Sequence, residues 1–235
     1  MAIKRVVYHY TGGSPGTIKW TERSCLRASR AAEVRCTEVM EFARQNQKAM
    51  LLLHAATQDY AAARCLLLNH LFVGLSIGAQ AIEKYLKAAI LFAEPSREVR
   101  RLGHNISELL SEAECCIPSL AHLALKDSAD RFVQYYQTRY PYNSNQPLSM
   151  DTGRRDELDL FVTGVNSRLP IPRNVKFRSG LYAEITFSLG YEQTVSPNER
   201  WIKEWNSALM PLWPEIESQY PDVMGELYPN AEEAC

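Results

Sequence analysis

The feature that most limits the fold of this chain is a proline-free stretch from Thr21 to Glu94. Alanine, leucine, glutamate, arginine and glutamine dominate it, and these residues favour helix. The stretch is too long for one ordinary helix, so several helices must share it. We predict helices over about 22–47 and 49–67, then a turn at Asn69-His70 into a third helix that ends near Phe92. The chain is therefore expected to be mainly α-helical.

The third of these helices has a clear amphipathic pattern. Glu83 and Lys87 lie four residues apart on a polar face, where a surface ion pair would contribute about 0.3–0.5 kcal/mol. Apolar residues recur at spacings of three or four on another face, which is typical of a helix that lines a core. These residues are Leu75, Ala79, Ile82, Leu86 and Ala89.

Two more helices are predicted before the amino-acid composition of the chain changes. One starts at Asn105-Ile106, and the other opens at Pro118 or Ser119 and stops at Tyr140-Pro141. A polar loop follows, and prolines return at positions 170 and 172. We therefore expect a second unit to begin at about residue 143.

The second unit is predicted to contain a β-hairpin and a helix. Asn174–Arg178 and the alternating Leu181–Leu189 are the expected strands. Ser196–Glu199 combines an N-cap serine, a proline at the first helical position and a glutamate three residues after the cap. Trp201 and Trp205 follow at helical spacing and are expected to be core residues, although an aromatic platform for bases that also includes Trp213 is the alternative.

Composition excludes several classes of function. Lys plus Arg total 26 and Asp plus Glu total 27, so no global positive field holds nucleic acid, and any polynucleotide site must be a local patch. The six cysteines contain no C-x-x-C pair, and the five histidines complete no zinc-ligand spacing. We expect no metal or cofactor, and we expect reduced thiols in a cytoplasmic protein.

A membrane location is not expected either. The N-terminus develops no apolar segment of the kind that export signals contain. The most apolar stretch, Cys65–Ile82, is interrupted by Asn69, His70, Ser76 and Gln80, which would be costly in hydrocarbon. A buried helix is the better interpretation of that stretch.

Three segments of the chain resemble the HEPN family. Gln80–Ala88 (QAIEKYLKA) is similar to the family's Q-A-x-E-K-x-L-K-A helix. Gly103–Leu110 (GHNISELL) resembles its G-H-(D/N)-I-x-x-L-L segment, and Arg139-Tyr140-Pro141 resembles the R-Y-P that ends its last helix. The resemblance covers about residues 49–142 and implies an antiparallel helical bundle there. Residues 1–48 would be a mostly helical N-terminal extension, and residues 143–235 a C-terminal appendage with the hairpin and helix.

The resemblance leaves the activity open between two lineages. HEPN ribonucleases act without metal, carry R-x(4–6)-H near the start of the last bundle helix, and pair across a dimer. The corresponding region here has His122 but no arginine at that spacing before it. Arg97 and His104 satisfy the spacing, but across a loop that contains Gly103. We therefore treat the catalytic motif as displaced or absent.

The resemblance accordingly implies a non-catalytic module that binds a nucleotide or nucleic acid, and a homodimer. One alternative is an endoribonuclease of a toxin–antitoxin or defence system, in which Arg97 and His104 would be catalytic. The other is a protein-interaction scaffold that partners a nucleotidyltransferase. Whether the protein is an enzyme stays open at this point.

His104 is the central candidate for ligand binding, because an imidazole at a helix N-terminus suits a phosphate. The full phosphate-binding set is Lys87, Arg97, Arg101, His104, Asn105 and Arg139, and Glu83 and Lys84 could complete a polar pocket. Each has a plainer interpretation. Asn105 or His104 can simply cap the helix, Glu83 and Lys87 can form an ion pair, and the run Arg97, Arg100, Arg101 can be solvated.

Overall fold

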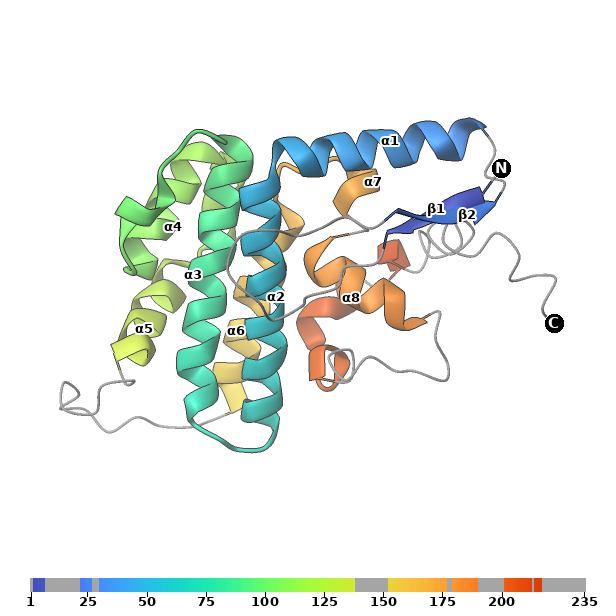
Figure 1. Ribbon diagram of the computed structural model, residues 1–235. Coiled ribbons are helices and arrows are strands. Elements are labelled where there is room, and N and C mark those ends of the chain that lie inside the picture. Colours follow the sequence, from blue (N-terminus) through green and yellow to red (C-terminus); the bar gives the residue numbers. More distant parts are fainter. Residues whose placement is uncertain are drawn as a thin grey trace.

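The computed structural model describes residues 2–6, 22–26, 30–137, 152–176, 179–189, 201–212 and 214–216. These residues are mainly helical, as predicted (Figure 1). The exception is a short antiparallel pair of strands near the N-terminus, β1 (Ala2–Val6) and β2 (Glu22–Leu26). The helix predicted from about residue 22 therefore begins later, because Ser24 and Cys25 are weak helix formers and instead lie in a strand paired with β1.

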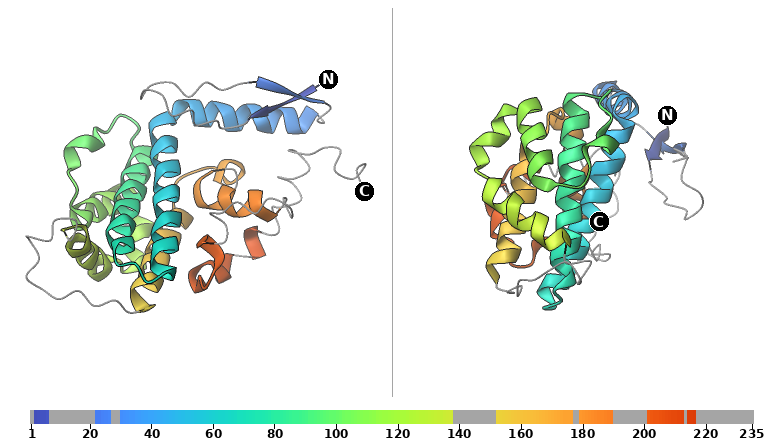
Figure 2. Two further views of the ribbon diagram at one scale, coloured as in Figure 1. Left: turned by 60° about the horizontal axis from the view of Figure 1, so that its bottom comes forward. Right: turned by 90° about the vertical axis from the view of Figure 1, so that its left-hand side faces the viewer.

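Three long helices follow in the order the sequence predicts. They are α1 (Arg30–Gln45), α2 (Gln47–Leu68) and α3 (Val73–Ala93). The helices α2 and α3 run antiparallel, while α1 projects from the start of α2 away from the bundle (Figures 1 and 2). The predicted turn at Asn69-His70 is confirmed, since Asn69 caps α2 and His70 has a positive φ of 58°.

The chain returns along α3 through the short helix η1 (Val99–Leu102) and then forms α4 (Ile106–Cys116). The single helix predicted from Pro118 to Tyr140 is wrong at its start. The structure instead has a 3-10 helix, η2 (Pro118–Leu123), and then α5 (Lys126–Gln137). Ala124 separates them because its φ of 50° is left-handed and cannot continue a helix.

The helix α6 (Thr152–Ser167) was not anticipated from the sequence. It packs against α3 at Gly78, where an added Cβ would lie 2.9 Å from Cδ2 of Leu158. Phe161 of α6 also meets Phe132 of α5 edge to face, with ring centroids 6.3 Å apart. One cluster of buried apolar side chains runs through α2 to α6 and on to Ile216. The helix α6 thus shares the core of the bundle, although the sequence places it in the C-terminal unit.

The predicted C-terminal β-hairpin is wrong. Its two strands are the helices α7 (Arg173–Lys176) and α8 (Gly180–Leu189). In the predicted strand, side chains would alternate between a buried and an exposed face, and Tyr182 would be exposed. In the structure Tyr182 is 1% exposed and lies between the buried Leu181 and Ala183. The described start of α8 is buried on more than one side. In the sequence, the short apolar run of such a helix has no periodicity that distinguishes it from a buried strand.

The aromatic segment near the C-terminus also differs from expectation. A helical segment described from residue 201 ends at Lys203, the chain turns at Trp205 with a φ of 56°, and η4 (Ser207–Leu212) follows. Trp205 is 74% exposed, so its assignment to the core is wrong. Its neighbour Asn206 is buried instead, and its Nδ2 donates to the Tyr60 hydroxyl. The predicted cap Ser196–Glu199 and Trp213 lie outside the described residues.

Within the described ranges, no helix combines the length and apolar character needed to cross a membrane.

Candidate functional site

Two of the segments that carry the family resemblance meet directly in the structure. Lys87 Nζ on α3 donates to Glu83 Oε1 at 2.8 Å and to the Gly103 carbonyl at 2.7 Å. The same carboxylate oxygen lies 2.9 Å from Nδ1 of His104. We call Glu83, Lys87, Gly103 and His104, together with Tyr136, the Glu83 cluster.

Burial divides this cluster into a floor and a rim. The side chains of Glu83 and Lys87 are each 10% exposed, whereas that of His104 is 66% exposed. The ion pair predicted between Glu83 and Lys87 is therefore present, but it is buried beneath the imidazole rather than solvated on the helix surface. Removing one member would leave a largely buried charge without its partner, which costs far more than breaking a surface pair.

Gly103 gives the loop before α4 its shape. Its φ of 70° and ψ of −150° lie in a region that is essentially restricted to glycine. An added Cβ would meet nothing within 4 Å, so the requirement is conformational rather than steric. This backbone conformation turns the Gly103 carbonyl to Lys87 and brings His104 to Glu83.

Tyr136 from α5 completes the rim. Its ring stacks on the imidazole of His104, with centroids 5.7 Å apart and planes inclined by 16°. The sequence placed Tyr136 on a helix but gave no sign that it belongs to the site. Only the packing of α5 beside the loop brings the two rings together.

Asn105 serves as the N-cap of α4. Its Oδ1 accepts from the backbone N–H groups of Ser107, at 3.1 Å, and Glu108, at 3.4 Å. Its Nδ2 donates to Oε1 of Glu108, and Ser107 Oγ contacts Asp130 Oδ1 at 2.5 Å. Two of the backbone N–H groups that could have held a phosphate at this helix start are thus already occupied, with carboxylates beside them.

Arg97 does not contact His104 in the structure. It pairs with Glu112 at 2.8 Å and lies 3.9 Å from Glu94, at the end of α3. Glu94 and Glu83, the partner of His104, are about three helical turns apart, or about 16 Å along the axis. The spacing that matched a ribonuclease motif by count therefore does not form a pair within one chain.

The remaining predicted cations that the structure describes have other partners. Arg101 pairs with Glu98 at 2.9 Å and is 81% exposed, in accord with a solvated loop. Lys84 faces α2, where its Nζ lies 2.5 Å from Asp59, so it does not join the cluster. Arg139 lies outside the described residues.

Comparison with protein-family models, with curated proteins and with solved structures finds no match to this chain.

The resemblance to the HEPN family thus rests on the three motif segments. What the structure adds is that two of them, on α3 and at the start of α4, are in direct polar contact.

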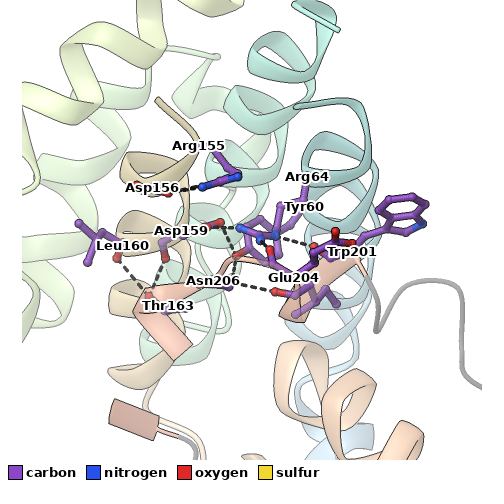
Figure 3. A network of polar contacts seen from close by, with 11 residues as sticks. Tyr60, Arg64, Arg155, Asp156, Asp159, Leu160, Thr163, Trp201, Glu204 and Asn206 are labelled. Atoms are coloured by element: carbon purple, nitrogen blue, oxygen red, sulfur yellow. Dashed lines mark hydrogen bonds and ion pairs between the residues drawn. The ribbon is translucent and has the colours of Figure 1, made fainter. Parts of the chain in front are cut away.

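A second polar network lies between α2, α6 and the C-terminal segment (Figure 3). The Arg64 guanidinium pairs with the Asp159 carboxylate, and these side chains are 0% and 1% exposed. Tyr60 donates to Asp159 Oδ1 at 2.7 Å and accepts from Asn206 Nδ2 at 2.8 Å. Arg64 also donates to the carbonyls of Trp201 and Glu204, which ties the C-terminal segment to α2.

This second set, which we call the Arg64 network, has the character of a structural clamp. Burial, and then the negative charge of Asp159, raises the pKa of Tyr60 well above its ordinary value. No water-exposed face is left on Arg64 or Asp159 for a ligand. The sequence gives no sign of this network, because nothing near Arg64 indicates that its partner lies on a distant helix.

Within the residues that the structure describes, no group of three or more His, Cys, Asp or Glu side chains is arranged to hold a metal ion. Cys65, Cys115 and Cys116 are free thiols.

Proposed function

We propose that this protein is a HEPN-type module that binds a nucleotide or nucleic acid at the rim of the Glu83 cluster without cleaving it. The observation that carries the proposal is the convergence of Glu83, Lys87 and His104, which come from two motif segments, beneath an imidazole that is 66% exposed. A purely structural ion pair would not need an exposed aromatic ring held above it.

The rim offers two kinds of contact to such a ligand. The stacked rings of His104 and Tyr136 form an aromatic surface, and nucleobases stack on such surfaces with little dependence on sequence. Because an ionised carboxylate only accepts hydrogen bonds, the contact with Glu83 assigns the neutral imidazole's hydrogen to Nδ1. Nε2 is then the polar atom with which His104 can meet a ligand.

Lys87 acts in this proposal through its neighbours rather than on the ligand. Its ammonium is buried against Glu83 and the Gly103 carbonyl, so it holds the carboxylate and the loop in place. Asn105 has a similar positioning role as the cap of α4. The residues that meet the ligand are His104 and Tyr136, and Arg139 stays a prediction.

The absence of cleavage is inferred from the position of Arg97. In the HEPN ribonucleases that the chain resembles, the arginine of the motif acts together with the histidine on the reacting phosphate. Here the guanidinium of Arg97 is engaged by Glu112, away from the imidazole. Within one chain the described residues therefore provide the binding surface without the second catalytic group.

The test is binding of short single-stranded RNAs and nucleotides, measured by the rise in melting temperature and by fluorescence anisotropy. We expect His104→Ala and Tyr136→Leu each to weaken binding about tenfold, since stacking on one ring contributes about 1–3 kcal/mol per base. His122→Ala is the matched control, because His122 is an exposed histidine of η2. Binding that is unchanged in both rim variants, or absent in the wild type, would refute the proposal.

Gel analysis of the same RNAs tests the non-catalytic part separately. We expect intact RNA with and without a chelator. Cleavage that survives chelation and disappears in both His104→Ala and Arg97→Ala would show that the ribonuclease alternative is right.

A further inference from the structure

The charges around His104 decide what its imidazole can hold. From α3 it faces Glu83, whose charge is balanced by Lys87 at 2.8 Å. From α5 it meets the neutral ring of Tyr136. At the start of α4, Asn105 bonds to Glu108, and Ser107 contacts Asp130. Of the described groups in contact with the imidazole, none adds a net positive charge. Glu108 and Asp130 make the start of α4 acidic, while in the preceding turn Arg100 is exposed and Arg101 pairs with Glu98.

A neutral His104 is poorly suited to a phosphate in this setting. Its Nδ1–H is directed to Glu83, which leaves a lone pair on Nε2. That lone pair would face the lone pairs of a phosphate oxygen, with Glu108 and Asp130 adding like charge. Addition of a proton at Nε2 reverses both effects, because it creates an N–H donor and a positive charge at the exposed edge of the ring.

We propose that the Glu83 cluster binds a phosphodiester of single-stranded nucleic acid through the Nε2–H of protonated His104, so that affinity rises as the pH falls. This inference rests on the function proposed above and adds its regulation. The Nδ1–H stays on Glu83 throughout, and the proton that binds at Nε2 is the one that responds to pH. The Lys87 ammonium keeps the charge of Glu83 balanced, so the new positive charge is not simply cancelled.

The probe is a short oligouridylate, because neither its phosphodiesters nor its bases change charge between about pH 5.5 and about pH 8, a range that spans the ordinary titration of histidine. Affinity is measured by anisotropy at fixed ionic strength, since phosphate contacts depend strongly on salt. We expect wild-type affinity to be at least about tenfold higher at the lower pH, the usual size of one charge-assisted hydrogen bond. His104→Gln should bind weakly and equally at both values, and the control His122→Gln should keep the wild-type dependence.

Melting temperatures of each variant at both pH values establish that the comparison is between folded proteins, which the exposure of His104 favours. Affinity that is equal at the two pH values, or a pH dependence that persists in His104→Gln, overturns this inference alone and leaves the binding function standing. A wild type that binds no oligonucleotide at either pH overturns both.

Discussion

The protein contains two polar networks of similar composition and opposite access to water. The Arg64 network and the Glu83 cluster each join a cation to a carboxylate. In the first, Tyr60 donates to the carboxylate of Asp159. In the second, Tyr136 stacks on His104, which contacts the carboxylate of Glu83. In the first, Arg64 and Asp159 are 0% and 1% exposed, whereas in the second His104 is 66% exposed above its ion pair. The same side-chain chemistry thus forms a structural clamp where it is enclosed and a candidate binding site where one group stays exposed to water.

The two networks also hold different parts of the chain. The Arg64 network attaches the segment around Trp201 and Glu204 to α2 and α6 (Figure 3). The Glu83 cluster attaches the loop before α4 to α3. Variants that break one network should therefore differ from variants that break the other, both in stability and in ligand binding.

The largest effect is expected from Arg64→Met. It leaves the Asp159 carboxylate buried without its cation, which should lower the free energy of unfolding by about 3–5 kcal/mol. Denaturant unfolding measures this change. Arg44→Met is the matched control, because Arg44 is 77% exposed and pairs with Glu41 on the surface; its effect should stay below about 1 kcal/mol.

The double variant Arg64→Met, Asp159→Leu separates the lost charge balance from the lost contacts. Replacing both members of a buried ion pair by apolar residues is often close to neutral, so the double variant should recover most of the stability that the single variant loses. A double variant as unstable as the single one would show that the bonds to the Trp201 and Glu204 carbonyls, and not the charge on Asp159, determine the effect.

A smaller loss is expected from Lys87→Met. Glu83 would keep its contact with His104 but lose the ammonium, and we expect a decrease of about 2–3 kcal/mol in the free energy of unfolding. Lys84→Met is the control on the same helix, since its pair with Asp59 is 31% and 25% exposed and should contribute less than about 1 kcal/mol. Thermal or denaturant unfolding of both variants makes the comparison, and equal losses would contradict the buried role of Lys87.

The smallest effect for a single residue is an alkaline loss of stability that arises from three buried tyrosines, of which Tyr60 belongs to the Arg64 network. Burial raises the pKa of Tyr60 and Tyr85 well above their ordinary value, and it raises the pKa of Tyr182 to about 12. A tyrosine in the unfolded chain ionises near pH 10. The stabilisation is therefore complete below about pH 10 and is lost as the pH rises toward the folded-state values, by about 1.4 kcal/mol per pH unit for each tyrosine.

Denaturant unfolding between about pH 9 and about pH 11 measures that slope. Tyr60→Phe should make it shallower, because one buried phenol no longer contributes. An identical slope in the variant would exclude Tyr60 as a source of the pH dependence.

Much of the bundle was predictable because local interactions specify it. The helix composition before Glu94 predicts α2 and α3, Asn69-His70 marks the turn between them, and Asn105 begins α4 as a cap would. The residues of the Glu83 cluster on α3 and in its loop were also identified. Tyr136 and the detachment of Arg97 from His104 were not, since both depend on how α5 and the loop after α3 pack.

The helical class, the positions of the main helices and the three motif segments can be identified from the sequence, because propensity, capping and periodicity act over a few neighbouring residues. Three outcomes required the folded structure: Leu181–Leu189 lies in a helix, Trp205 is exposed, and Arg64 is enclosed with a partner on α6. These outcomes depend on burial against segments far away in the chain. Local pattern carries no information about which surface will cover a residue, so the difference between clamp and site emerges only when the helices are packed.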